Sequence, residues 1–160
     1  MKQFVLALLA SALLAGCGFR PLYAGQSGSG FVSSQQINVS EIPGRGGYRL
    51  RQELIRDLAT GIPGVESGAL LKIGLREQIE RATLLPDGAV SRSFYNASGS
   101  YVLETSSGPI SGRTSVQVPY AASRTPYTDV SAQTYAAERA MAELSRKIVE
   151  QLRIQAQNQE

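Results

Sequence analysis

Few residues in this chain are of the types and spacings that support catalysis. The sequence contains no histidine and one cysteine, which excludes Ser-His-Asp and Cys-His catalysis and a His- or Cys-rich metal site. Glu77 and Glu80 have opposite parity on one predicted strand, so they do not form a carboxylate pair. A Ser-Lys pair using Lys72 or Lys147 has no supporting motif. We therefore predict no catalytic residue, metal or cofactor, and expect a protein that is not an enzyme.

A glycine-rich segment, Gly44-Arg45-Gly46-Gly47, precedes a predicted helix. Such a segment can hold an anion at a helix N-terminus. It lacks the Lys-Ser/Thr ending of a phosphate loop, so we interpret it as a flexible entry to the helix.

Basic residues on predicted strands are the stronger candidates for binding: Lys72, Arg76, Arg81, Arg92 and Arg113. If several of them share one face of a sheet, they form a positive patch for phosphate or carboxylate groups. Ordinary surface charge, balanced by nearby glutamates, is the open alternative. Four tyrosines are also candidates for a partner interface or for the core, namely Tyr95, Tyr101, Tyr120 and Tyr127.

The single cysteine lies at the end of a targeting sequence. Lys2 is followed by an apolar run over Phe4–Leu14 and by small residues, which is typical of a secretory signal peptide. The run is much shorter than the roughly 20 residues that span a bilayer. Leu14-Ala15-Gly16-Cys17 resembles the bacterial lipobox, in which the cysteine thiol takes a diacylglyceryl group. We predict cleavage after residue 16 and lipidation of Cys17, with the membrane bound through this N-terminal lipid.

The residue after the cysteine and the net charge bear on location and partners. Position 18 is glycine and not the aspartate that commonly retains lipoproteins at the inner membrane, so we expect the outer membrane. Loss of Lys2 leaves a charge of (16 − 1) − 13 = +2, which gives little reason to expect nucleic acid as a partner.

The remaining elements predict a single domain, as suits a chain of 160 residues. Alternation and apolar spacing predict a strand over 37–42, a helix over 48–62, strands over 69–80, 89–104 and 110–120, and a long helix capped at Thr128 or Asp129 that frays over 155–160. Pro86-Asp87-Gly88 predicts a hairpin turn, and Gly99 a bulge or bend.

Each predicted helix has one apolar stripe and the sheet has one apolar face. The predicted fold class is therefore α+β, a mostly antiparallel four-stranded sheet with two helices packed on one face. The other sheet face is rich in Ser, Thr, Arg and Gln and faces water or a partner. The predicted organisation is a signal peptide (1–16), a lipid-anchored N-terminal segment (17–36) and an α+β domain (37–160).

The segment Cys17-Gly18-Phe19-Arg20-Pro21-Leu22-Tyr23 resembles the start of the LPS-assembly lipoprotein LptE family, especially its alphaproteobacterial branch. The order of predicted elements also matches that family. The resemblance implies a lipoprotein that faces the periplasm, plugs the lumen of the outer-membrane β-barrel LptD, assists its assembly and takes part in lipopolysaccharide transport. From strand parity, we expect Arg76, Arg92 and Arg113 to contact lipopolysaccharide.

Two other functions stay open. An auxiliary lipoprotein of a periplasmic ABC-type lipid transport system would have the same anchor and a similar small domain. A lipid-anchored hydrolase is the third class, and the missing histidine and paired acids count against it.

Overall fold

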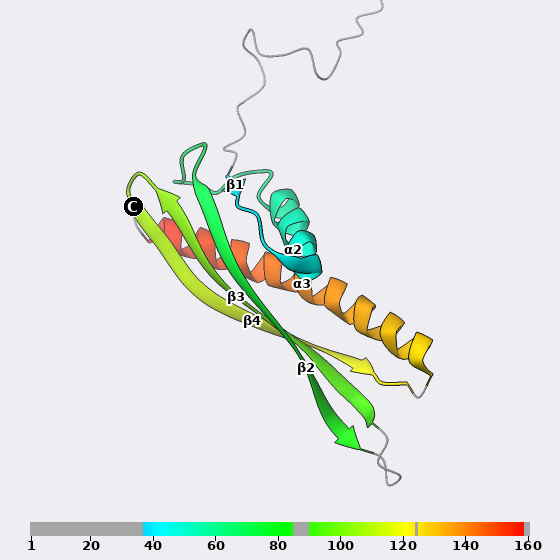
Figure 1. Ribbon diagram of the computed structural model, residues 1–160. Coiled ribbons are helices and arrows are strands. Elements are labelled where there is room, and N and C mark those ends of the chain that lie inside the picture. Colours follow the sequence, from blue (N-terminus) through cyan, green and yellow to red (C-terminus); the bar gives the residue numbers. More distant parts are fainter. Residues whose placement is uncertain (1–36, 85–89, 124, 159–160) are drawn as a thin grey trace, which may run out of the picture. The chain divides into compact units, whose positions relative to one another are not determined.

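The computed structural model describes residues 37–84, 90–123 and 125–158, in which two helices cover one face of a four-stranded sheet (Figure 1). The elements are β1 (Asn38–Val39), α2 (Gly44–Asp57), β2 (Leu70–Leu84), β3 (Val90–Thr105), β4 (Gly108–Ala121) and α3 (Pro126–Gln157). Their order and the α+β fold class confirm the prediction. The predicted signal peptide and anchored segment lie outside the described residues, as does the Pro86–Gly88 turn.

The sheet has the order β1-β2-β3-β4. β1 pairs parallel with β2, and the other neighbours pair antiparallel. Because successive side chains of a strand point to opposite faces, the register places Leu71 of β2, Leu103 of β3 and Ile110 of β4 in one row beneath the helices. The register shifts only near Arg81–Leu84.

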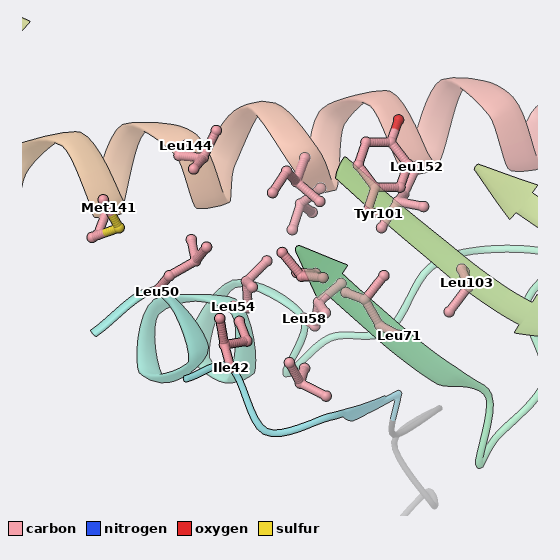
Figure 2. Close-up of a cluster of buried hydrophobic side chains, with 14 of the residues drawn as sticks. Ile42, Leu50, Leu54, Leu58, Leu71, Tyr101, Leu103, Met141, Leu144 and Leu152 are labelled. Carbon is pink, nitrogen blue, oxygen red and sulfur yellow. The ribbon is translucent and has the colours of Figure 1, made fainter. Parts of the chain in front are cut away.

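The core lies between the helices and this face of the sheet (Figure 2). α2 contributes Leu50 and Leu54, one turn apart, and α3 contributes a longer stripe whose members recur every three or four residues. The fully buried members include Leu50, Leu54, Leu71, Tyr101, Leu103, Met141, Leu144, Ile148 and Leu152. One continuous cluster thus joins both helices to β2, β3 and β4.

The predicted bounds of α2 were wrong at both ends. Gly44 has a φ of +87°, which glycine adopts without strain, and the helix begins there and not at Tyr48. The predicted flexible entry is thus the first helical turn. At the other end Asp57 closes the helix, and Gly61 N–H donates to the Leu58 carbonyl at 2.8 Å in the following turn. Ile62 is buried, although it lies outside the helix.

α3 begins earlier and ends later than predicted. Pro126 is the first helical residue, a position that tolerates proline because no helical N–H is needed there. Asp129 therefore lies in the first turn, where its Oδ1 accepts a 3.1 Å bond from the N–H of Ser123. The helix continues to Gln157 because Leu152 and Ala156 are still buried. Within the described ranges, no helix combines the length and apolarity needed to cross a bilayer.

Gly99 is not a bulge or bend, contrary to the prediction. It pairs regularly with Leu75 on β2 and Thr114 on β4. A Cβ at this position would lie 3.2 Å from Ile148 Cδ1 and 3.6 Å from Leu144 Cδ2. Glycine therefore serves the close approach of α3 to β3.

Candidate functional site

The sheet has two faces, and the one opposite the helices, the outer sheet face, is the more polar. We define it by the residues that alternate with the core positions of β2, β3 and β4. At its centre, cross-strand rows join Arg76 to Ser98 and Ser115, and Gln78 to Asn96 and Gln117. Most apolar side chains of the same strands lie on the helix side, so this face presents mainly hydroxyls, amides and charged groups, with Phe94 and Val102 as apolar exceptions.

The three arginines predicted from parity all belong to the outer sheet face, and two of them lie near each other. Arg76 on β2 and Arg113 on β4 flank β3 in rows offset by two residues, which corresponds to about 12 Å between their Cα atoms. Arg92 lies opposite Ala121, six β3 residues away from the Arg76 row, at roughly 20 Å. Arg76 and Arg113 therefore form the candidate site, and Arg92 stands apart from it.

The other predicted basic residues are placed differently. Lys72 is also on the outer face, but its Nζ lies 2.6 Å from Glu104 Oε1. Arg81 has the opposite parity, on the helix side of β2. Arg76 and Arg113 form no ion pair with another described residue. Both guanidinium groups are exposed and can bind an external phosphate or carboxylate.

A shallow hollow lies beside Arg76. It has a volume of about 630 Å³ and is lined in part by Arg76, Gln78, Asn96, Ser98, Ser115 and Gln117. The lining also includes Glu143 and Lys147 of α3. Ala97 and Val116 are the apolar members of the lining. The other side chains can donate or accept a hydrogen bond, so the hollow suits a polar surface or headgroup.

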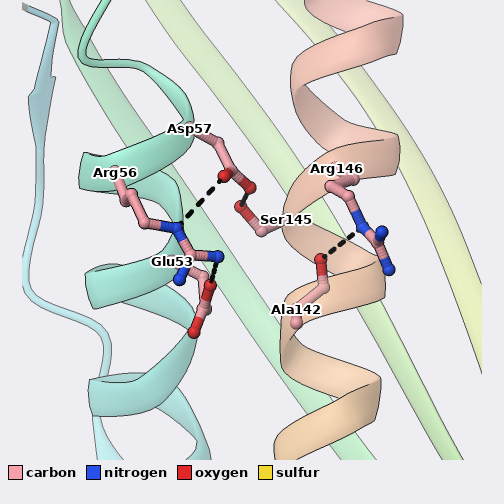
Figure 3. A network of polar contacts seen from close by, with 6 residues as sticks. All are labelled: Glu53, Arg56, Asp57, Ala142, Ser145 and Arg146. Carbon is pink, nitrogen blue, oxygen red and sulfur yellow. Dashed lines mark hydrogen bonds and ion pairs between the residues drawn. The ribbon is translucent and has the colours of Figure 1, made fainter.

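The structure gives the serines no catalytic partner among its described residues. Lys147 Nζ donates to the backbone carbonyl of Ser115 at 3.3 Å, and not to a serine hydroxyl. Ser145 Oγ donates to Asp57 Oδ2 at 2.7 Å (Figure 3). Ser145 is completely buried, so this bond ties α3 to α2 and the hydroxyl cannot reach a substrate. The Ser145–Asp57 contact joins residues far apart in sequence, and no local pattern predicted it.

Glu77 supplies the negative charge at the start of α2. The first turn has no acidic residue and no side-chain cap. An ideal Cβ on Gly46 would overlap the Glu77 carboxylate, which shows that this carboxylate reaches the backbone of the first turn. A negative charge there complements the helix dipole. The Gly44–Gly47 segment, which the sequence offered as a candidate anion site, therefore already contacts the carboxylate of Glu77.

Tyr95 holds this carboxylate in place, because its hydroxyl donates to Glu77 Oε1. The ring of Tyr95 is buried on the helix side of β3, and burial raises the pKa of its phenol, with smaller raising effects from the hydrogen bond and the charge of Glu77. Burial raises the pKa of Tyr101 as well. Tyr95 and Tyr101 are thus core residues, whereas Tyr127 is exposed.

The raised phenol pKa predicts a loss of stability at alkaline pH. Above pH 10, the ordinary value, the unfolded state releases the Tyr95 proton and the folded state keeps it, so stability falls as pH rises. One such group contributes up to about 1.4 kcal/mol per pH unit. We expect Tyr95→Phe to reduce this slope in urea unfolding between pH 9 and 11. Tyr127→Phe is the control and keeps the original slope; equal slopes in all three proteins would contradict the assignment.

No protein-family model matches the chain, and no curated protein matches it by sequence. Solved structures do match. Rare lipoprotein B from Shewanella oneidensis has 11% sequence identity, covers 77% of this chain and 96% of its own, and gives a TM-score of 0.59. This likeness shows a shared α+β fold.

A second solved structure shows more than the fold. It is a protein from Caulobacter crescentus CB15 provisionally named a lipoprotein, with 30% sequence identity and a TM-score of 0.59. The match covers 76% of this chain and 91% of the other. The chain belongs to the family of this Caulobacter protein.

Proposed function

We propose that this protein is an outer-membrane lipoprotein that plugs and assists assembly of an LptD-type β-barrel and takes part in lipopolysaccharide transport. It acts by binding and not by catalysis. Cys17 carries the lipid, and the domain faces the periplasm and the barrel lumen. The resemblance of Cys17–Tyr23 to the LptE family supports this function, as does membership of a family that includes a protein named a lipoprotein.

The observation that carries the proposal is the outer sheet face. A small domain has to bury its apolar side chains, and here the helix side of the sheet accomplishes this. The opposite face is mainly hydrophilic, and no other described helix or strand covers it. The lumen of an outer-membrane barrel is polar, so a hydroxyl- and amide-bearing sheet face complements its wall. Arg76 and Arg113 on this face suit the phosphates of lipopolysaccharide.

Affinity capture tests the partner. A C-terminally tagged chain, expressed in its native host and extracted in mild detergent, is expected to recover a large outer-membrane barrel. Gln78→Trp places a bulky ring on the exposed outer face and is expected to reduce this recovery at least tenfold. Gln52→Trp is the matched control on the exposed side of α2 and retains the barrel.

Two results would contradict the proposal. Recovery of an inner-membrane transporter in place of the barrel would favour the auxiliary role in ABC-type lipid transport. Equal recovery of the barrel by both tryptophan variants would show that the outer sheet face is not the docking surface.

A further inference from the structure

β4 is an edge strand of the sheet (Figure 1). It pairs with β3 along its whole length, from Gly108 to Ala121. In an antiparallel pair, the backbone N–H and C=O of every second residue point away from the neighbouring strand. No other described strand pairs with these groups of β4, so a further strand can pair with them once Lys147 Nζ releases the Ser115 carbonyl.

Prolines identify which residues face the open edge. Pro109 and Pro119 have no N–H and belong at positions that do not bond to β3. Ser115 has the same parity, and its carbonyl accepts the 3.3 Å bond from Lys147 Nζ. The edge-facing residues between the two prolines are therefore Ser111, Arg113, Ser115 and Gln117. We call the segment Ser111–Gln117 the β4 window.

Charge distinguishes the β4 window from the open part of β2. The carbonyl of Leu71 accepts a bond from the N–H of Ser40 on the β1 side, so the odd-numbered residues of β2 face that edge. They include Glu77 and Arg81, and charged side chains protect an edge strand from pairing with another chain. The β4 window carries Arg113 as its one charged residue. It is thus the less protected edge.

We propose that the β4 window pairs antiparallel with the β4 window of a second copy of this chain, around a two-fold axis at Thr114. Thr114 lies midway between Pro109 and Pro119, so this register sets each proline opposite the other proline of the partner copy. Ser111 then faces Gln117, and Arg113 faces Ser115. Each edge-facing pair exchanges two backbone bonds, about eight in total.

In this register the side chains of the β4 window are complementary to those of the β4 window in the second copy. Arg113 faces a neutral hydroxyl and not another arginine, and Thr114 faces Thr114, a favourable cross-strand pair. On the helix side Ile110 faces Val118, and both already belong to the core. Such a self-matching patch is what a two-fold interface requires.

Residues of α3 support a second copy as the occupant. Glu143 and Lys147 line the same hollow as Ser115 and Gln117, so a two-fold axis brings one carboxylate and one ammonium group from each copy to the seam. Lys147 gives up its contact with Ser115 when the edge is paired. This inference does not rest on the proposed function: the dimer is a form of the free protein, and its seam includes the β4 side of the hollow beside Arg76.

Cysteine crosslinking of the full chain in detergent micelles tests the register. Thr114 and its copy form a pair without mutual backbone bonds, with Cα atoms about 4.5 Å apart, within the range that a disulfide bridges. Thr114→Cys is expected to give mostly disulfide-linked dimer under mild oxidation. Ser111→Cys is the control, because residue 111 and its copy are roughly 20 Å apart. The unsubstituted chain reports any background from Cys17.

A second variant tests the edge itself. Ser115→Pro removes an edge-facing N–H without removing a bond to β3, and in the Thr114→Cys background it is expected to lower crosslinking at least tenfold. Circular dichroism confirms that the fold is kept. Crosslinking of Thr114→Cys no higher than that of Ser111→Cys would overturn the proposal. So would a crosslinked product containing a different protein, or crosslinking that Ser115→Pro does not reduce in the folded chain.

Discussion

Replacing Arg76 and Arg113 together by glutamate is expected to weaken the binding of lipopolysaccharide by at least about a hundredfold, since each charged hydrogen bond contributes about 1.5–3 kcal/mol. Both side chains lie on the outer sheet face and form no ion pair with another described residue. The substitution therefore reverses the charge of the candidate site without breaking an internal contact. Binding is measured by titrating lipopolysaccharide into the purified protein.

Two controls separate a site from general charge. Arg139→Glu with Arg153→Glu makes the same change in net charge on the exposed side of α3 and is expected to change affinity less than threefold. Arg92→Glu, roughly 20 Å from the Arg76 row along β3, is expected to have a small effect. If the α3 double variant lost as much affinity, net charge alone would explain the binding of lipopolysaccharide. The assignment of Arg76 and Arg113 as its site would then be wrong.

Truncating Leu144 to alanine is expected to lower the free energy of unfolding by about 3–4 kcal/mol. Leu144 is completely buried, and α3 places it over Gly99 of β3. The close approach at Gly99 leaves little room for the backbone to collapse into the cavity. Urea unfolding at pH 7 measures the change.

Ile154→Ala is the matched control for this prediction. Ile154 lies on the same helix but is 53% exposed, so its truncation is expected to cost less than about 1 kcal/mol. Similar losses for the two variants would mean that α3 does not lie on β3 as described.

Periodicity predicted the architecture because each element buries a single face. The α3 stripe and the alternation in β4 both reflect one-sided burial, and the two helices had only the sheet's apolar face to cover. The ends of the helices were less predictable. Gly44 and Pro126 start helices through backbone geometry, which apolar spacing does not report. Ile62 fits the apolar spacing of the α2 stripe, but it lies after the end of the helix and is buried there.

Strand parity also predicted that the three arginines share a face, but not that Arg92 lies far from Arg76 and Arg113 on it. Distance along a face depends on register, and register depends on the pairing of β2 with β3 and of β3 with β4. Glu77 illustrates the same limit. The sequence pattern predicted only that Glu77 lies on a strand. Its contact with the start of α2 arises from tertiary packing.

The alternation of β2, β3 and β4 has a consequence for how this protein changes over time. Odd and even residues of one strand are under separate constraints. One set packs against the helices, and the other is exposed on the outer sheet face. Substitutions on the hydrophilic set can alter recognition while leaving the melting temperature almost unchanged. A designer can therefore change the binding specificity of this scaffold by substituting every second residue of β2, β3 and β4.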